Sequence, residues 1–362
     1  MSSSFGHNIK LQVFGQSHSE MLGVVIDGLP AGYSLDMQQI QAFLNRRRGG
    51  QNAYSTTRAE ADAPRIVSGL VDGMTCGAPL CALFENANVR GKDYDALSTV
   101  PRPSHADYYA NEKHYGAQDF RGGGHFSGRM TLALCFAGAV CMQLLERWDV
   151  HIGAHIEQIY NVLDKPYDPL NISATDLRYD DFPVNDSAVA EAMQQTMLDA
   201  AAEGDSVGGV IECAAIGLPI GAGSPMFAGI ENQLAQAVFA VPAVRGIEFG
   251  AGFEAAGMLG SEHNDPFCLS KDQNAGDILH KSNNAGGVVG GLSTGAPLIF
   301  RVAIKPTPSI SKEQDSVDLD AMEEVKLSVT GRHDPCIVPR AVPCIEAVAA
   351  FVLADILVQD HA

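Results

Sequence analysis

Basic residues are scarce in this sequence. The 362 residues include 24 lysines and arginines against 43 aspartates and glutamates, and the formal net charge is −19. Proteins that bind nucleic acids usually present a basic surface, so this balance argues against a nucleic acid partner. The shortage also makes the places where arginines gather more informative than they would be in a basic protein.

The cysteine spacing of zinc sites is also missing. The 8 cysteines form no C-x-x-C pair. Several stand in apolar runs, as Cys135 and Cys141 do, and we expect buried free thiols in a reducing compartment. No signal peptide opens the sequence, and no uninterrupted apolar run reaches the roughly 18–20 residues that span a bilayer. We therefore expect a cytoplasmic protein with no membrane contact and no metal.

No low-complexity linker and no repeat of fixed period divides the chain, whose hydrophobic content of 46% is enough for a large core. Strands are predicted over residues 24–30, 208–217 and 298–304. Apolar spacing predicts helices over residues 36–47, 131–148, 187–203, 229–240 and 341–358. The mixture indicates one α+β domain over residues 1–362.

The most informative segment is the glycine-rich stretch RGGGHFSGR at residues 121–129. Consecutive glycines leave backbone N–H groups unobstructed, and a helix is predicted to begin directly afterwards. Such a loop favours the binding of anions. Arginine also accompanies histidine in RPSHAD at 102–107 and in GRHDPC at 331–336. Any one of these arginines could be a surface residue paired with a carboxylate, but the set favours a multiply anionic ligand.

Histidines in these segments are candidates for proton transfer, because imidazole titrates near neutral pH. His105 lies near Asp107 in sequence, and further candidates are His125 and His333. His18 stands between two serines and, taken alone, is better explained as a hydrogen-bonded surface residue.

Two other patterns are weak. Residues 291–295 match the G-x-S-x-G pattern of a nucleophile elbow, but a strand is predicted afterwards instead of the required helix, which indicates a chance match. The glycine pairs at 286–287 and 290–291 could admit a flat ligand or could simply form tight turns.

Taken together, these segments resemble those of the chorismate synthase family along nearly the whole chain. The matching stretches are FGQSH (14–18), RRRGG (46–50), RPSHADY (102–108), RGGG (121–124), GDSVGG (204–209), NAGG (284–287), KPT (305–307) and GRHDPC (331–336). The resemblance implies a β-α-β sandwich, a homotetramer and the 1,4-anti elimination of phosphate from 5-enolpyruvylshikimate 3-phosphate to give chorismate. It also implies reduced FMN as cofactor without net redox change, with NADPH only as an indirect source of reducing equivalents.

The resemblance further implies roles for individual residues. His18 would donate a proton to the leaving phosphate, His105 would protonate or polarise the reduced flavin, and Asp334 would assist removal of the substrate C6 proton. The substrate would be bound by Ser17, Arg47, Arg48, Arg102, Ser127, Arg129 and Arg332. The flavin would be bound by His125, Phe126, Ser127, Ala243, Gly290, Lys305, Pro306, Thr307, Pro308, Ser309 and Arg332.

The chain departs from the family pattern at several positions. Gln16 and Ser19 replace a glutamate and a glycine, and the glycine loop continues as HFSGRMT instead of RSSARET. Ala53 and Pro242 stand where arginine and asparagine are usual. Because the arginine at position 53 is lost, we expect dependence on an external flavin reductant. Alternatives are a non-catalytic anion- or flavin-binding protein, against which the retained histidines and Asp334 argue, and a flavin-dependent oxidoreductase.

Overall fold

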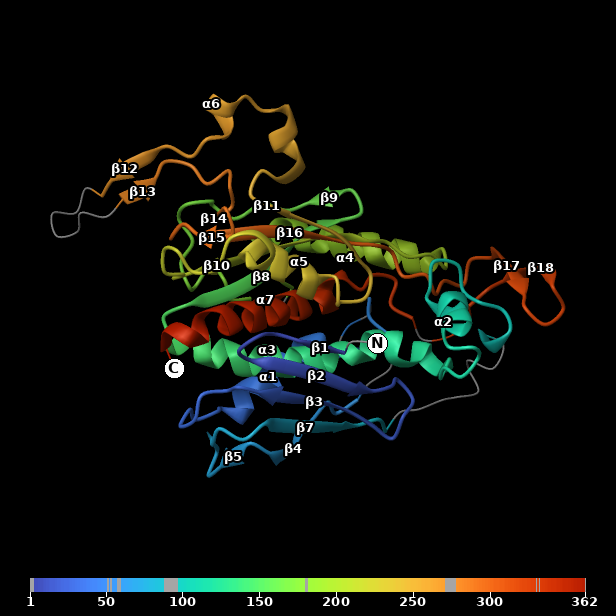
Figure 1. Cartoon of the computed structure of the whole chain (residues 1–362). Helices are drawn as coiled ribbons and strands as arrows, with labels where there is room; N and C mark the ends of the chain where they lie inside the picture. Colours follow the sequence, from blue (N-terminus) through green and yellow to red (C-terminus); the bar gives the residue numbers. More distant parts are fainter. Residues whose placement is uncertain are drawn as a thin grey trace.

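Two five-stranded sheets enclose a central layer of helices (Figure 1). The computed structural model describes residues 3–50, 52, 54–56, 60–87, 97–179, 182–270, 278–329, 331 and 333–361. Ala53 and Arg332, both singled out from the sequence, lie outside the described residues. One continuous hydrophobic core reaches from Ile9 to Val358 and includes residues of both sheets and of the helices between them.

The first sheet is antiparallel and lies at the bottom of Figure 1. Along its strands, side chains that face the helices alternate with side chains that face away from them. In β3, Leu22, Val24 and Ile26 are completely buried. Its strands, in spatial order, are β1 (Ser4–Phe5), β2 (Lys10–Gly15), β3 (Met21–Asp27), β7 (Leu80–Glu85) and β4 (Arg65–Ser68).

The second sheet is also antiparallel and covers the opposite side of the helices. Ile211, Cys213 and Ala215 of β10 belong to the main core, while Ala214 faces a smaller cluster on the outer side. Its strands, in spatial order, are β11 (Val244–Phe249), β16 (Leu298–Ile304), β10 (Gly209–Ile216), β8 (His151–Ile159) and β9 (Val162–Leu163).

Three helices fill the middle layer: α1 (Met37–Arg47), α3 (Thr131–Arg147) and α7 (Val338–His361). A Cβ atom at Gly138 of α3 would overlap the backbone of Ala347 of α7, so glycine permits a very close helix crossing there. The helical segments Gly128–Arg147 and Val338–Gln359 are long and apolar enough to cross a membrane, but most of each is buried inside the protein. They are core helices.

The remaining elements lie around these layers. The short strands are β5 (Leu70–Val71), β6 (Met74–Thr75), β12 (Phe267–Leu269), β13 (Ile278–His280), β14 (Val288–Val289), β15 (Leu292–Ser293), β17 (Gln314–Asp318) and β18 (Glu323–Leu327). The helices are α2 (Asp107–Lys113), η2 (Arg121–Phe126), η3 (Gly128–Met130), α4 (Ser187–Ala202), η4 (Met226–Ala228), α5 (Ile230–Val238), η5 (Gly252–Gly257) and α6 (Gly260–His263).

The predicted α+β fold is confirmed. The strand predicted over residues 298–304 is found with these ends, and the other predicted elements are found with shifted ends. The first predicted strand begins at Met21 and ends at Asp27, because Gly28 adopts a left-handed φ of 86°. The last helix begins three residues earlier than predicted, at Val338. Pro339 is compatible with that start, because the first turn of a helix needs no N–H donor at this position.

Candidate active site

The glycine loop contacts the segment that carries the first predicted histidine. Gly122 has a φ of 60°, and a Cβ atom there would lie 2.5 Å from Cε1 of His18 and 2.6 Å from Oγ of Ser17. The backbone N–H of Ser17 donates a hydrogen bond to the carbonyl of Gly124 at 3.0 Å. Ser17 and His18 are both buried, so His18 is not the surface histidine that the sequence left open.

The same loop contacts the second predicted histidine. A Cβ atom at Gly123 would lie 3.1 Å from Cε1 and 3.3 Å from Nε2 of His105. Nδ1 of His105 lies 2.5 Å from Oδ1 of Asp107. Because an ionised carboxylate only accepts hydrogen bonds, Nδ1 is the donor in this pair, and Nε2 remains on the side of the glycine loop. Two adjacent glycines thus separate His18 from His105, which are distant in sequence.

Asp107 also holds Arg102. Nε and Nη2 of Arg102 donate to the two carboxylate oxygens at 2.7 and 2.9 Å, and Nη1 donates to Oγ of Ser309 at 2.9 Å. Burial would raise the pKa of Asp107, but hydrogen bonds from Arg102 and His105 and their charges outweigh it and hold this pKa well below its usual value. Asp107 therefore stays ionised at neutral pH.

A second buried carboxylate, Asp62, joins two of the predicted substrate arginines. It accepts a hydrogen bond from Nη2 of Arg47 at 2.6 Å and forms an ion pair with Nη1 of Arg129. Nε of Arg129 donates to Asn86 at 2.9 Å. Burial acts to raise the pKa of Asp62, but the charges of Arg47 and Arg129 outweigh it and lower this pKa. Nothing in the sequence around Asp62 marked it as a site residue.

Asp334, the third predicted catalytic residue, is connected through Arg340 to Arg47. Arg47 belongs to the cluster with Asp62 and Arg129, which we call the arginine layer. Its Oδ1 accepts a hydrogen bond from the backbone N–H of Thr56 at 2.8 Å, and its Oδ2 forms an ion pair with Arg340. Nε of Arg340 also donates to the backbone carbonyl of Arg47 at 2.9 Å. The GRHDPC stretch ends at Cys336, so the sequence pattern did not point to Arg340.

The segment 305–309 follows β16 and lies against the histidine segment. Nζ of Lys305 donates to the carbonyl of Ser104 at 2.5 Å, and its backbone N–H donates to the carbonyl of Ala243 at 3.0 Å. Burial, aided by a nearby arginine, lowers the pKa of Lys305. The backbone carbonyl of Thr307 accepts a hydrogen bond from the hydroxyl of Ser206 at 2.8 Å. The structure thus brings Ala243 and 305–309 to the predicted site.

Oγ1 of Thr307 and Nε2 of His333 are among the buried polar atoms that have no hydrogen-bond partner in the described residues. Burial and the charge of Arg102 lower the pKa of His333 despite the neighbouring Asp334, which favours a neutral ring. Buried polar atoms without partners are costly. A ligand with polar groups would satisfy both atoms, so the residues present fit a polar cofactor.

The residues after the glycines make protein contacts of their own. Nδ1 of His125 lies 2.8 Å from the carbonyl of Gly15, and Nε2 lies 2.8 Å from Oγ of Ser3. Both ring nitrogens therefore tie the loop to the N-terminal strands. The hydroxyl of Ser127 accepts a hydrogen bond from the N–H of Arg129 at 3.3 Å, and Phe126 is exposed.

Gly290 is separated from the other predicted cofactor residues within one chain. It lies in the turn of the β14–β15 hairpin, which precedes β16, whereas Lys305 follows the far end of that strand. Seven strand residues span about 20 Å. Open space surrounds Gly290, but Gly286 and Gly287 pack against backbone atoms, so tight packing explains that first pair.

The remaining arginines differ in their surroundings. Arg48 is half-buried and donates to Oδ1 of Asn45 at 3.1 Å. Arg121 is exposed, and its Nε lies 2.8 Å from Oδ1 of Asp119. It is therefore a surface arginine paired with a carboxylate, the alternative to a ligand-binding role. Arg46 forms two hydrogen bonds with Glu346, at 2.6 and 2.8 Å.

The suspected nucleophile elbow is a chance match. Ser293 is buried, its hydroxyl donates to the carbonyl of Pro219 at 2.5 Å, and the strand β16 follows it, not a helix.

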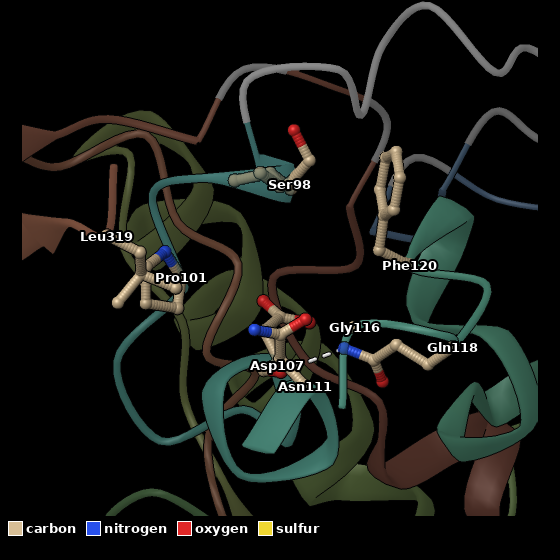
Figure 2. A pocket seen from close by; sticks show the side chains of 9 residues that line it. Ser98, Pro101, Asp107, Asn111, Gly116, Gln118, Phe120 and Leu319 are labelled. Atoms are coloured by element: carbon tan, nitrogen blue, oxygen red, sulfur yellow. Dashed lines mark hydrogen bonds between the residues drawn. The ribbon is translucent and has the colours of Figure 1, made fainter. Parts of the chain in front are cut away.

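A small hollow with a volume of about 30 Å³ lies beside Asp107 (Figure 2). Its lining includes Asn111, Gln118 and Leu319, and the side-chain amide of Gln118 donates to the backbone carbonyl of Asp107 at 3.0 Å. That volume accommodates roughly two water molecules and is too small for an organic ligand. It lies beside the histidine cluster and is not itself a substrate pocket.

Comparisons with known proteins identify the family of this chain. The family model of chorismate synthase matches residues 9–358. The chorismate synthase of Thermococcus gammatolerans is 44% identical over 357 residues, which cover 99% of this chain and 98% of that protein. The chain belongs to the chorismate synthase family. The chorismate synthase of Korarchaeum cryptofilum is 43% identical over 359 residues, which cover 98% of this chain and 97% of that protein.

The fold comparison gives the same result. A crystal structure of a chorismate synthase matches with a TM-score of 0.72 and 26% identity, covering 98% of this chain and 93% of that chain. The predicted family and its β-α-β sandwich are therefore confirmed. The roles of the individual site residues stay predictions.

Proposed function

We propose that this protein eliminates phosphate from 5-enolpyruvylshikimate 3-phosphate to give chorismate, with reduced FMN bound and without net redox change. The observation that supports this most directly is the placement of His18 and His105 on two sides of one glycine loop. Buried arginines lie in the same region, as a substrate with two carboxylates and a phosphate requires, and two ionised carboxylates hold these arginines in place.

His18 would donate a proton to the phosphate as the carbon–oxygen bond breaks, and Ser17 would bind the same group. The hydroxyl of Ser17 lies 3.2 Å from Nδ1 of His18, so both can reach one anionic group. Arg48, Arg102, Arg129 and Arg332 would bind and orient the substrate, with Arg47. Because Asp62 neutralises part of the charge of Arg47 and Arg129, these two would mainly fix orientation.

Asp334 would assist removal of the C6 proton, because Arg340 and the N–H of Thr56 hold its side chain in place. Reduced FMN, when bound, would supply the transient electron transfer that eases loss of the phosphate. The flavin would be held by Ala243, by residues 305–309 and by His105, whose ring is oriented by Asp107. The unpartnered hydroxyl of Thr307 fits a polar group of that cofactor.

We extend the proposal to a homotetramer. Apolar side chains of β12 and β13, among them Phe267 and Leu269, are exposed on an arm that extends away from the body at the top of Figure 1. Such surfaces favour burial against another copy. If Gly290 contacts the flavin as proposed, a neighbouring copy would have to supply it, because it lies far from Lys305 in its own chain.

Cytoplasmic location and an external flavin reductant belong to the same proposal, with NADPH acting only indirectly. Turnover under anaerobic conditions with NADPH and FMN alone would contradict the need for an external reductant.

The decisive experiment is phosphate release from 5-enolpyruvylshikimate 3-phosphate, measured anaerobically with chemically reduced FMN. Wild type should release phosphate and form chorismate, while His105→Ala should lose about 10²–10⁴-fold in kcat. His7→Ala serves as a matched control, because the His7 side chain is 73% exposed. A folded, flavin-binding protein without turnover would favour a binding protein, and net flavin oxidation coupled to substrate would favour an oxidoreductase.

A further inference from the structure

Two buried cysteines face each other where α3 and α7 pack together, near Arg47 of the arginine layer. Sγ of Cys135 on α3 lies 3.7 Å from Sγ of Cys344 on α7, and both residues are buried. All 8 cysteines are free thiols. The other buried ones are Cys141, Cys213 and Cys336, and within the described residues their sulfurs form no hydrogen bond with a second sulfur.

The helix crossing brings these sulfurs together. The backbones of α3 and α7 come very close at Gly138 and Ala347, and each cysteine lies three residues before one of these residues. The two cysteines therefore share one side of the same helix seam. A disulfide needs an Sγ–Sγ distance of about 2.05 Å, so the sulfurs must approach by only about 1.7 Å.

The two thiols differ in acidity, and this favours exchange chemistry. The hydrogen bond from Cys135, together with the positive charges of Arg47 and Arg340, lowers the pKa of Cys344 despite its burial. Burial raises the pKa of Cys135 well above the ordinary value. Cys344 is therefore the better nucleophile, since the thiolate is the reactive form.

A proline near the start of α7 provides a route by which a small oxidant can reach the two sulfurs. Pro343, directly before Cys344, lies inside the helix and has no N–H for the helical ladder. Local opening needs less free energy where such a bond is missing. Hydrogen peroxide is a small molecule and can enter through an opening of this kind.

The pair is also connected to the candidate site. Thr131 lies one turn before Cys135, and its hydroxyl accepts a hydrogen bond from Arg47 at 3.4 Å. Arg340 lies one turn before Cys344 and forms the ion pair with Asp334. A contraction between the sulfurs would therefore shift the residues that hold Arg47 and Asp334.

We propose that Cys135 and Cys344 are a dithiol that hydrogen peroxide converts into a disulfide, and that this disulfide lowers the activity of the site in front of it. The Cys344 thiolate attacks one peroxide oxygen, the O–O bond breaks, and hydroxide leaves, which forms a sulfenic acid. The Cys135 sulfur attacks that sulfur and releases water once its own proton is lost. Two thiols are oxidised, and one peroxide is reduced to two waters.

The test is peptide mapping of the native full-length protein after treatment with hydrogen peroxide, in a Cys76→Ser background that removes the exposed thiol. Trypsin should release residues 130–147 joined to residues 341–362, and a reductant should separate them. Because Cys141 shares the first peptide, Cys135→Ser must abolish the cross-link, whereas Cys141→Ser must leave it unchanged.

Phosphate release provides the second readout, and only this part rests on the proposed function. Oxidation should lower kcat/KM about tenfold to a hundredfold, as expected for a displacement near 1 Å, with recovery after reduction. Cys344→Ser should remain active and resist the loss. Absence of the cross-link in the folded protein overturns the dithiol, whatever the activity. A cross-link without loss of activity overturns the coupling to the site, and inactivity of the reduced wild type counts against the proposed function alone.

Discussion

Two arginine–carboxylate clusters flank the glycine loop, and they are built in different ways. In the first, Arg102, His105 and Asp107 lie within six residues of one another, on a turn that leads into α2. In the second, Asp62 joins Arg47, at the end of α1, to Arg129, which lies 67 residues beyond Asp62. The first cluster holds a histidine ring, whereas the second balances two buried positive charges. The local cluster therefore orients a reactive group. The long-range cluster neutralises buried charge and also connects segments from different layers of the fold.

The largest effect should come from breaking the long-range cluster. Asp62→Asn leaves two buried arginines without their counter-charge, and removing one partner of a buried ion pair typically costs about 3–5 kcal/mol. We expect the free energy of unfolding in urea to fall by about that amount. An unchanged value would mean that water already compensates both arginines.

The local cluster should respond in catalysis more than in stability. Asp107→Asn removes the negative charge and replaces one acceptor oxygen with an amide donor, so the side chain can no longer accept from both Arg102 and His105, and we expect kcat to fall about 10²–10⁴-fold. The free energy of unfolding should fall by less than in Asp62→Asn, because only one arginine loses its partner. Steady-state kinetics with reduced FMN and urea titrations on the same preparation measure both. An equal loss of stability in the two variants would remove the distinction.

Alanine substitutions in the glycine loop test the His18 side and the His105 side of the site separately. Gly122→Ala would place a methyl group 2.5 Å from His18, while Gly123→Ala would place one 3.1 Å from His105. Both positions have positive φ, which costs about 1 kcal/mol for alanine, and the closer contact adds strain at Gly122. We expect the larger drop in melting temperature and in kcat for Gly122→Ala. Thermal unfolding and kinetics would show the opposite order if the His105 side were the more rigid one.

Because of these two carboxylates, the free energy of unfolding should also depend on pH in the acid range. The pKa values of Asp62 and Asp107 are lowered in the folded protein, so their contributions are complete above the unfolded value of about 4 and are lost as the pH falls below it. Urea unfolding of wild type and Asp107→Asn should therefore differ by a constant amount between pH 6 and pH 8, and by less below about pH 4. A difference that grows on acidification would contradict this assignment.

The smallest effect is expected for a surface pair. Lys326 lies 2.5 Å from Asp315 on the β17–β18 hairpin, and both side chains are exposed. Solvent and salt screen such pairs, so Lys326→Ala should change neither the free energy of unfolding nor kcat measurably. The same kinetic and urea experiments provide the baseline for the two buried clusters.

The local cluster could be predicted from the sequence because its members are neighbours and proline and glycine fix the backbone around them. The segment 102–107 was singled out, and His105, Asp107 and Arg102 do contact one another. The sequence also pointed to Asp334, but not to Arg340 that holds it. Asp62 gave no signal, because its partners approach only when α1 and η3 pack together. Likewise His125 was expected at the flavin, yet both its ring nitrogens contact the N-terminal segment.

The sequence by itself determined the family, the α+β class and the segments that carry arginine, histidine and glycine, because these depend on residue type, apolar spacing and order along the chain. Only the tertiary structure decided which of those segments meet. The sheet order, the Gly138–Ala347 crossing that brings Cys135 to Cys344, and the sharing of Asp62 by two arginines all depend on contacts between residues far apart in sequence. Such contacts form where buried charges must be paired and apolar faces must be covered, and neither requirement has a fixed spacing along the chain.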